Sequence, residues 1–269
     1  MELSGARIIL TGAAGGIGNQ LAQRLAESGA KLFMVGRSEA GEELARTLTG
    51  QGRDVTFQRM DLLQHGAVPQ LINSALAVLG GIDLLINLAG AMSFESFVAE
   101  DPEVTERLMR INVMVPMQLC QAVLPYMLEQ KHGRIANIGS IFGSIGFAYF
   151  TTYSASKFAL RGFSEALRRE LAGSGVGVSY IAPRATKTSF NDDSVYRMGE
   201  SVKMKFDDPD YVARVIVNSI RADMDEAYIG WPEKFFVRLN ALLPRVVDSG
   251  VTKQNRQAEK FVRPASSTR

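Results

Sequence analysis

Short apolar runs alternate along the chain with longer segments in which apolar residues recur every three or four positions. The short runs are apolar at consecutive positions rather than at every second one, which is typical of strands buried on both faces. The sequence therefore predicts strands at 7–11, 31–35, from 55–57 onward, 83–87, 134–138, 176–181 and, as a short seventh, 227–230.

The longer segments have the spacing of helices that bury one face. They are predicted at 17–28, 39–48, 68–79, 104–128 and 152–171, and a further helix is predicted from Pro209 with Asp207 or Asp208 as its N-cap. Strands that alternate with helices form a parallel sheet covered on both faces. We expect an α/β, doubly wound (Rossmann) fold of about seven strands, one domain over 1–251, with ligands at the carboxyl ends of the strands.

A glycine-rich turn follows the first strand and opens the first helix, Thr11-Gly12-Ala13-Ala14-Gly15-Gly16-Ile17-Gly18. Glycines permit a sharp turn and close backbone approach, and a helix N-terminus offers unpaired N–H groups to an anion. The glycines could serve only to shape the turn, but their place in a βαβ unit favours a dinucleotide pyrophosphate. The predicted contacts are Thr11, Gly12, Gly16, Ile17 and Gly18.

The end of the second predicted strand indicates which dinucleotide is preferred. NAD sites place an acidic residue there for the ribose 2′-hydroxyl, whereas an arginine fork suits the 2′-phosphate of NADP. Here Gly36 is followed by Arg37 and Ser38, without a carboxylate at these positions. The alternative for Arg37 is a solvated surface side chain. The sequence predicts NADP(H), with NAD(H) as the less favoured cofactor.

Composition narrows the class of protein. The 269 residues carry 30 Lys and Arg against 28 Asp and Glu, and a net charge of +2 is too small to indicate nucleic-acid binding. The one cysteine, Cys120, cannot form an internal disulfide and is expected to pack in the core in a reducing compartment. We find no signal-peptide pattern and no uninterrupted apolar stretch long enough to span a bilayer, so the expected location is the cytoplasm. We also predict no metal-binding residues.

Tyr153 and Lys157 lie four residues apart in a predicted helix, so their side chains share one face. A neighbouring ammonium favours the tyrosinate and would lower the pKa of the phenol from about 10 towards neutrality. The phenol would then be a usable general acid or base. The pair alone is a weak signal, because an aromatic side chain beside a lysine is common on helix surfaces.

Further residues follow in an order and spacing that one family shares. They are the Thr-Gly-x-x-x-Gly-x-Gly turn at 11–18, Asp61-Leu62 after the third strand, Asn87-Leu88-Ala89-Gly90 after the fourth, Asn112 in the long helix, Ser140 at the end of the fifth strand, and the Tyr153–Lys157 pair. With these residues the chain resembles a short-chain dehydrogenase/reductase of the NADP-preferring type, over nearly its whole length.

The resemblance implies a catalytic set. Ser140 would hydrogen-bond a substrate carbonyl oxygen, Tyr153 would give or take the proton, and Lys157 would hold the nicotinamide ribose. Asn112 would link Lys157 through water to a proton relay. The implied cofactor contacts are Tyr153 and Lys157, Asp61 and Leu62 at the adenine ring, Asn87, Ala89 and Gly90 near the adenosine ribose, and Pro183, Thr186 and Thr188 at the nicotinamide carboxamide.

The implied function is NADP(H)-dependent interconversion of a ketone or aldehyde and an alcohol, on an apolar or acyl-chain small molecule. The alternative is a catalytically silent dinucleotide-binding regulatory or scaffold protein of the same fold. A homodimer or homotetramer is implied through the two long helices, where apolar or small residues are suited to packing, namely Phe158, Ala159, Gly162, Phe163, Ala166 and Leu167.

Two positions depart from the family pattern. Leu88 replaces the second asparagine of the Asn-Asn-Ala-Gly motif, which removes a polar contact expected to stabilise the strand. Arg184 follows Pro183 where the family has glycine, and since arginine adopts positive φ only at a cost, the turn must differ or carry strain. Arg184 is left with two interpretations: it pairs with an acidic substrate group or a cofactor phosphate, or it faces solvent.

The C-terminal part is predicted to shape the substrate side. Residues 189–208 are polar, lack a strong period and resemble the family's mobile lid, which excludes water. Apolar residues between Trp231 and Val247 recur at helical spacing and predict an amphipathic helix over about 232–247, kinked or divided at Pro244. Such a stripe covers the cleft or a neighbouring subunit, or else makes shallow membrane contact. The basic tail, 252–269, is expected to be disordered.

Overall fold

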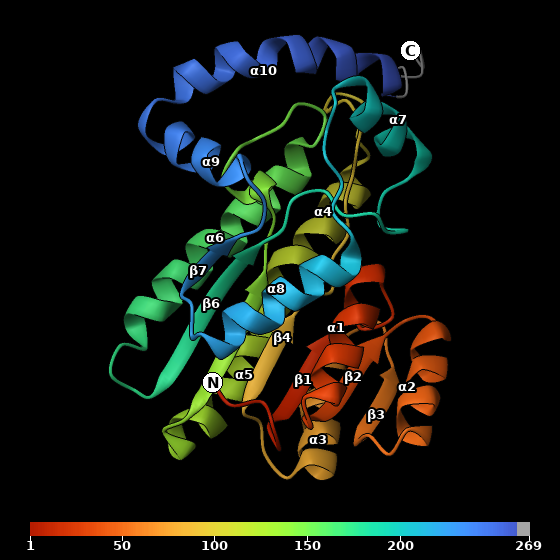
Figure 1. The fold of residues 1–269 in the computed structure, drawn as a ribbon, viewed down its shortest axis with the longest axis vertical. Coiled ribbons are helices and arrows are strands. Elements are labelled where there is room, and N and C mark those ends of the chain that lie inside the picture. Colours follow the sequence, from red (N-terminus) through yellow and green to blue (C-terminus); the bar gives the residue numbers. More distant parts are fainter. Residues whose placement is uncertain (263–269) are drawn as a thin grey trace.

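Within residues 1–262, which the computed structural model describes, seven strands form one parallel sheet in the order β3-β2-β1-β4-β5-β6-β7 (Figure 1). Their bounds are β1 Arg7–Thr11, β2 Lys31–Gly36, β3 Val55–Arg59, β4 Leu84–Asn87, β5 Gly133–Ile138, β6 Val176–Ala182 and β7 Glu226–Tyr228. The predicted α/β, doubly wound fold is confirmed.

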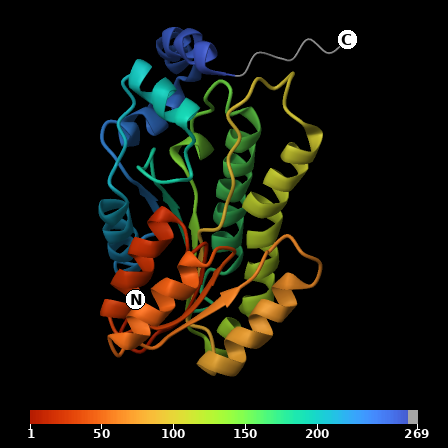
Figure 2. The ribbon, with the colours of Figure 1, turned by 90° about the vertical axis from the view of Figure 1, so that its right-hand side faces the viewer.

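Helices cover both faces of the sheet (Figure 2). One core lies under α1 Gly16–Glu27, α2 Ala40–Gly50 and α8 Pro209–Arg221, and a second under α3 Ala67–Leu79, α5 Val115–Gln130 and α6 Thr151–Glu170. Consecutive strand residues alternate between them: Ile8 and Leu10 belong to the first core and Ile9 to the second. Because both faces are covered, the central strands carry runs of consecutive apolar residues such as Ile8-Ile9-Leu10.

The strand order reverses at β1, which pairs with β2 on one side and β4 on the other. The chain leaves β1 and β4 in opposite directions, which opens a crevice at their carboxyl ends. The turn at Gly12 has φ +73° and lies against the loop that follows β4, because a Cβ there would be 2.8 Å from the Ala89 nitrogen. Glycine is therefore required at position 12 by both conformation and space.

The predicted helix 104–128 is interrupted where Asn112 lies. The structure divides it into α4 Pro102–Met109, the π-helical turn η1 Arg110–Met114, and α5. Together they form one helix, Pro102–Gln130, that is long and apolar enough to cross a membrane by length and composition alone. Polar residues such as Asn112, Gln118 and Gln121 interrupt it, so the prediction of no uninterrupted apolar stretch of that length is not contradicted. Much of this helix is buried, and α5 packs on α3, β4 and β5, as a core helix of this fold does.

The C-terminal part contains more helix than the sequence predicted. Residues 189–208 include α7 Asp193–Ser201, in which Asp192 caps the N-terminus through the Val195 N–H at 2.9 Å. Val195, Met198 and Val202 are buried at helical spacing, a period that the polar neighbours obscured. The predicted N-cap of α8 is confirmed as Asp208, whose side chain accepts from the Asp210 N–H at 2.8 Å.

Pro244 divides the last predicted helix, as expected, into α9 Glu233–Leu242 and α10 Pro244–Ala258, which the 3-10 turn η3 Glu259–Phe261 follows. The prediction of disorder from residue 252 is wrong as far as 262, and 263–269 lie outside the described residues. Ala258 is fully buried in a cluster with residues of α7, so tertiary packing orders a segment whose composition is polar.

Candidate active site

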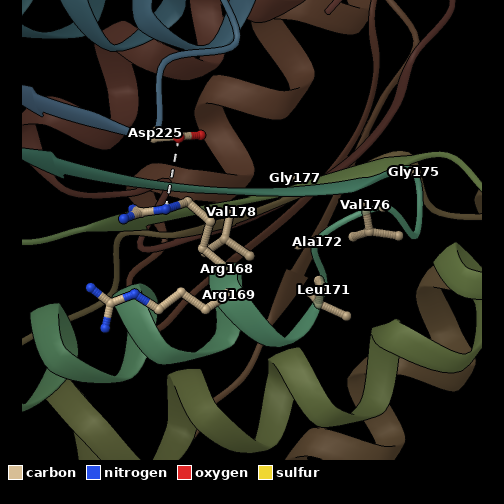
Figure 3. A pocket seen from close by; sticks show the side chains of 10 residues that line it. Arg168, Arg169, Leu171, Ala172, Gly175, Val176, Gly177, Val178 and Asp225 are labelled. Atoms are coloured by element: carbon tan, nitrogen blue, oxygen red, sulfur yellow. Dashed lines mark ion pairs between the residues drawn. The ribbon is translucent and has the colours of Figure 1, made fainter.

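A cavity of about 540 Å³ opens at the carboxyl ends of the strands, where the sequence predicted the ligand. Most of the predicted residues line it: Gly12, Gly16, Ile17, Gly18, Arg37, Asp61, Leu62, Ala89, Gly90, Ser140, Tyr153, Lys157, Pro183, Thr186 and Thr188. A second hollow of about 500 Å³ lies where α6 ends and β6 begins (Figure 3). It holds a partly exposed Arg168–Asp225 pair at 3.7 Å and none of the predicted site residues, so we place the site in the first cavity.

The glycine turn fits an anion. Gly16, Ile17 and Gly18 form the first turn of α1 and line the cavity, and the N–H groups of a first helical turn have no intrahelical partner. A Cβ at Gly18 would meet the Gly12 oxygen at 2.1 Å, and one at Gly16 would meet Thr188 Cγ2 at 2.4 Å. The helix N-terminus can therefore lie this close to the β1 turn and to Thr188 only with glycine at both positions.

Arg37 follows β2 and is exposed at the rim of the cavity. Its backbone oxygen accepts from Arg59 Nε at 2.9 Å, and Arg59 also forms an exposed pair with Glu39 at 3.2 Å. On the adjacent strand end, Asp61 accepts from the Leu63 N–H at 3.0 Å, which fixes the turn in which Asp61 and Leu62 line the cavity. This rim suits a nucleoside with a nearby phosphate.

Two predicted cofactor contacts lie behind the cavity instead of on its wall. Thr11 is buried, and its Oγ1 accepts from the N–H groups of Leu88 and Ala89, both at 3.1 Å, so it anchors the β4 loop to β1. Asn87 donates to Asn137 Oδ1 at 2.8 Å inside the core. The Asn87 side chain does not line the cavity, because the alternation along β4 turns it towards α5, and Leu88 lines the cavity instead. Contact between Asn87 and the ribose stays a prediction.

Ser140, Tyr153 and Lys157 meet on the cavity wall. Ser140 lies two residues after β5, and its Oγ accepts from the Phe142 N–H at 3.1 Å as the cap of the 3-10 turn η2 Ile141–Gly143. Tyr153 and Lys157 lie one turn apart on α6 and are both buried. The Lys157 ammonium donates to the Ile138 oxygen at 3.1 Å and lies 5.8 Å from the centre of the Tyr153 ring.

Burial moves the pKa values of this pair in opposite directions. It raises the pKa of the Tyr153 phenol to about 12, and the hydrogen bond with Ser140 opposes the rise. Burial also lowers the pKa of the Lys157 ammonium to about 8. The prediction that the ammonium lowers the pKa of the phenol towards neutrality is wrong for these residues by themselves, because desolvation of the buried phenol is the dominant cause of its pKa shift.

A stability test follows from the lowered pKa of Lys157. Lys157→Met should raise the free energy of unfolding at neutral pH by about 2 kcal/mol, because it removes a buried charge whose folded-state pKa lies below its unfolded-state value. The difference should shrink as pH rises from about 8 through 10.5, where the unfolded wild-type lysine also loses its proton.

Urea unfolding at several pH values measures this difference. Lys31→Met, which changes an exposed lysine at the start of β2, is the matched control and should show no such pH dependence. A Lys157→Met protein that is less stable than wild type at neutral pH would contradict the argument.

Asn112 joins the two sides of the site without reaching the cavity. Its amide donates to the Ala91 oxygen and to Ser156 Oγ, and its Oδ1 accepts from the Ala91 N–H, all at 2.9 Å. A Cβ on Gly90 would lie 2.9 Å from Asn112 Oδ1 and 3.8 Å from Lys157 Nζ, so both polar atoms lie beside Gly90. The side chain therefore satisfies the backbone at the π-helical turn, as expected of a helix irregularity, and lies close to Lys157.

Arg184, whose role the sequence left open, is buried and paired. Its guanidinium binds Asp207 at 2.6 and 2.8 Å and Glu233 at 2.9 and 3.1 Å. Its φ is not positive, so the turn differs from a glycine turn instead of being strained. The interpretation of a solvent-facing side chain is wrong. Arg184 ties the loop of Pro183, Thr186 and Thr188 to the start of α8 and to α9.

The far end of the cavity is aromatic, a feature that the sequence analysis missed. Phe142, Phe150, Phe190, Val195 and Met204 line it, and the Phe190 ring centre lies 6.3 Å from that of Tyr153. The signal was the density of phenylalanine between Ser140 and Tyr153. Arg107 and Lys205 are the cations at this rim, also missed.

Comparison with known proteins agrees with this geometry. The family model for short chain dehydrogenase matches residues 6–198. A ketoacyl reductase HetN from Nostoc is 30% identical over 84% of this chain and 79% of its own length. A mouse protein, dehydrogenase/reductase SDR family member 7B, is 35% identical over 72% of this chain, and the match spans 61% of the mouse protein.

Solved structures share the fold. A short chain dehydrogenase/reductase from Burkholderia phymatum in complex with NAD superposes with a TM-score of 0.83 over 92% of this chain and 96% of its own, at 23% identity. A metagenomic short-chain oxidoreductase in complex with NADP superposes with a TM-score of 0.72 over 85% of this chain and 98% of its own, at 28% identity. Relatives thus bind either nicotinamide dinucleotide. The chain belongs to the short-chain dehydrogenase/reductase family, a family of nicotinamide-dependent oxidoreductases.

Proposed function

We propose that this chain interconverts a ketone or aldehyde and an alcohol with NADP(H), by hydride transfer coupled to proton transfer at Tyr153. The observation that carries the proposal is the convergence of Ser140, Tyr153 and Lys157 on one cavity whose other wall is the glycine turn at the N-terminus of α1. The nicotinamide dinucleotide supplies the hydride when bound. The protein supplies orientation, a proton and a site that excludes water.

In this proposal each side chain acts at a stated atom. Ser140 Oγ donates to the substrate carbonyl oxygen and stabilises the negative charge that develops there. The Tyr153 phenol, with a pKa of about 12, keeps its proton at neutral pH and can donate it to the same oxygen. Lys157 holds the ribose hydroxyls, and Asn112 keeps the chain at 90–91 beside the Lys157 ammonium.

An apolar substrate fits the aromatic end of the cavity. The ring centres of Phe142 and Phe150 lie 5.1 Å apart with the rings tilted by 56°, and Phe190 also lines the cavity. Apolar pockets with few polar groups select the shape and length of an apolar chain. The loop and helix at 189–208 would cover the bound substrate as a lid. The Vibrio cholerae 3-oxoacyl-[acyl-carrier-protein] reductase FabG, 29% identical over 85% of this chain, supports an acyl-chain carbonyl as the substrate class.

Preference for NADP rests on Arg37. Arg37→Ala should weaken NADPH binding about 10- to 100-fold, because a charge-assisted hydrogen bond to the 2′-phosphate is lost, and should leave NADH binding within about twofold. Fluorescence titration with both cofactors measures the two dissociation constants. Arg53→Ala, in an exposed loop before β3, is the matched control. Equal losses for NADPH and NADH would contradict the NADP assignment.

The second candidate function is a catalytically silent dinucleotide-binding scaffold. The departures at Leu88 and Arg184 favour it, and the complete set of Asn112, Ser140, Tyr153 and Lys157 weighs against it.

We also propose a homodimer or homotetramer through η1, α5 and α6, where Met114, Met117 and Phe158 are exposed. Leu167, predicted for this surface, is instead buried in the core under α6.

A further inference from the structure

The helix α9 is attached to the protein along one side only. Glu233, Val237 and Asn240 share that side at helical spacing. Glu233 pairs with Arg184, Val237 is buried, and the Asn240 amide donates to the Ser144 oxygen at 2.9 Å. The opposite side of α9 and its junction with α10 therefore project away from the core.

Large apolar side chains occupy this outer side, which we call the C-terminal apolar face. Its members are Trp231, Phe235, Phe236, Leu242, Leu243 and Val246. Trp231 is 72% exposed and Leu242 79% exposed, and each of the six exceeds 40%. A stable soluble protein scatters single exposed apolar residues, whereas a contiguous group marks a contact surface.

Basic residues border the apolar face. Lys234, Arg238 and Arg245 are exposed, and in the part of the chain that the structure describes none of them takes part in an ion pair. From 231 to 262 the sequence holds six Lys and Arg and three Asp and Glu, and Glu233 among the latter is neutralised by Arg184. The face is therefore apolar and positively charged.

The positive charge of this face distinguishes between two possible binding partners, a second copy of the protein and a lipid surface. In a symmetric dimer the same face would meet itself, and the three unpaired cations of each copy would be brought together at a cost. An anionic lipid surface offers the complementary charge, and interfacial helices typically combine Trp and Phe with basic flanks. We propose that the C-terminal apolar face docks this protein on anionic membranes, peripherally and without spanning them.

The position of the face suits this role. Figures 1 and 2 show α9 and α10 at the end of the molecule where α7 also lies, with α10 outermost. Glu233, at the start of α9, also lines the cavity. A docked protein would therefore present the mouth of its cavity close to the lipid surface, whatever carbonyl it reduces.

Vesicle co-sedimentation of the full chain tests the proposal. Wild-type protein should sediment with vesicles of equal parts phosphatidylcholine and phosphatidylglycerol and much less with phosphatidylcholine alone, and added salt should release it. Trp231→Ser/Phe235→Ser/Leu242→Ser should lower the bound fraction at least about tenfold. Lys234→Glu/Arg238→Glu should abolish the preference for phosphatidylglycerol while leaving the apolar side chains intact.

Val78→Ser/Leu128→Ser/Met224→Ser removes three exposed apolar side chains elsewhere and should bind vesicles as wild type does. Circular dichroism and NADPH binding check that each variant is folded. The proposal is overturned if wild type stays in the supernatant with both vesicles, or if it and the serine variant of the face sediment equally. It is also overturned if that variant changes the oligomer mass in solution and leaves vesicle binding unchanged, which would assign the face to a second copy.

Discussion

Tyr153→Phe protein should lose about 10²- to 10⁴-fold in kcat for NADPH-dependent reduction of ketones and aldehydes. The substitution removes one oxygen atom from a side chain that is buried against Ser140 and Phe142, so the packing of the ring is kept. What is lost is the proton that the developing alkoxide would accept. Absorbance of NADPH, followed with a panel of apolar carbonyl compounds, measures the rate.

Cofactor affinity separates a chemical effect from a structural one. NADPH should bind Tyr153→Phe within about twofold of wild type, because the Lys157 ammonium and the glycine turn are unchanged. Tyr149→Phe, which removes a hydroxyl outside the cavity lining, is the matched control and should keep full activity. If wild type and Tyr153→Phe turn over the panel equally slowly while both bind NADPH, the silent scaffold is the better account.

Local sequence patterns were sufficient to predict the architecture of the fold. The central strands of this sheet are apolar at consecutive positions because helices cover both faces, so these runs were visible without any knowledge of pairing. The glycine turn and the Tyr153–Lys157 spacing are also local, since the first spans residues 11–18 and the second lies within about one turn of α6. Position along the chain placed these groups at the carboxyl ends of parallel strands, and that was enough to bring them together.

The structural features that the sequence did not predict depend on contacts between residues distant in the chain. Nothing near Asn112 shows that its amide will satisfy Ala91 and create a π-helical turn. The order of α10 depends on Ala258 packing against α7, some sixty residues earlier in the chain. The pKa of Tyr153 was predicted from one neighbouring charge, whereas burial by the surrounding chain sets it. Arg184 likewise has its partners at 207 and 233.

Arg184→Ala should lower the free energy of unfolding by about 3–5 kcal/mol. The side chain of Arg184 is 8% exposed and that of its partner Asp207 is 6% exposed, so truncation leaves a carboxylate that is buried and unpaired. Glu233 loses its partner as well and frees the start of α9. Because Asp207 pairs with the chain at Thr186, the loss should also raise the KM for the cofactor. Urea unfolding and initial-rate kinetics measure the two effects.

Further variants show whether the loss of stability comes from breaking a buried ion pair or from removing any arginine. Arg59→Ala breaks an exposed pair with Glu39 and should cost only about 0–1 kcal/mol. Arg184→Lys keeps the positive charge but loses the paired N–H donors of the guanidinium, so its free energy of unfolding should lie between those of wild type and Arg184→Ala. Arg184→Ala/Asp207→Ala should regain about 0.5–3 kcal/mol relative to the sum of the single changes, since it removes the stranded carboxylate. The argument would be contradicted if the stability losses of Arg184→Ala and Asp207→Ala were additive, or if Arg184→Ala lost no more stability than Arg59→Ala. Either result would mean that the Arg184 pair does not hold the cofactor loop to the C-terminal helices.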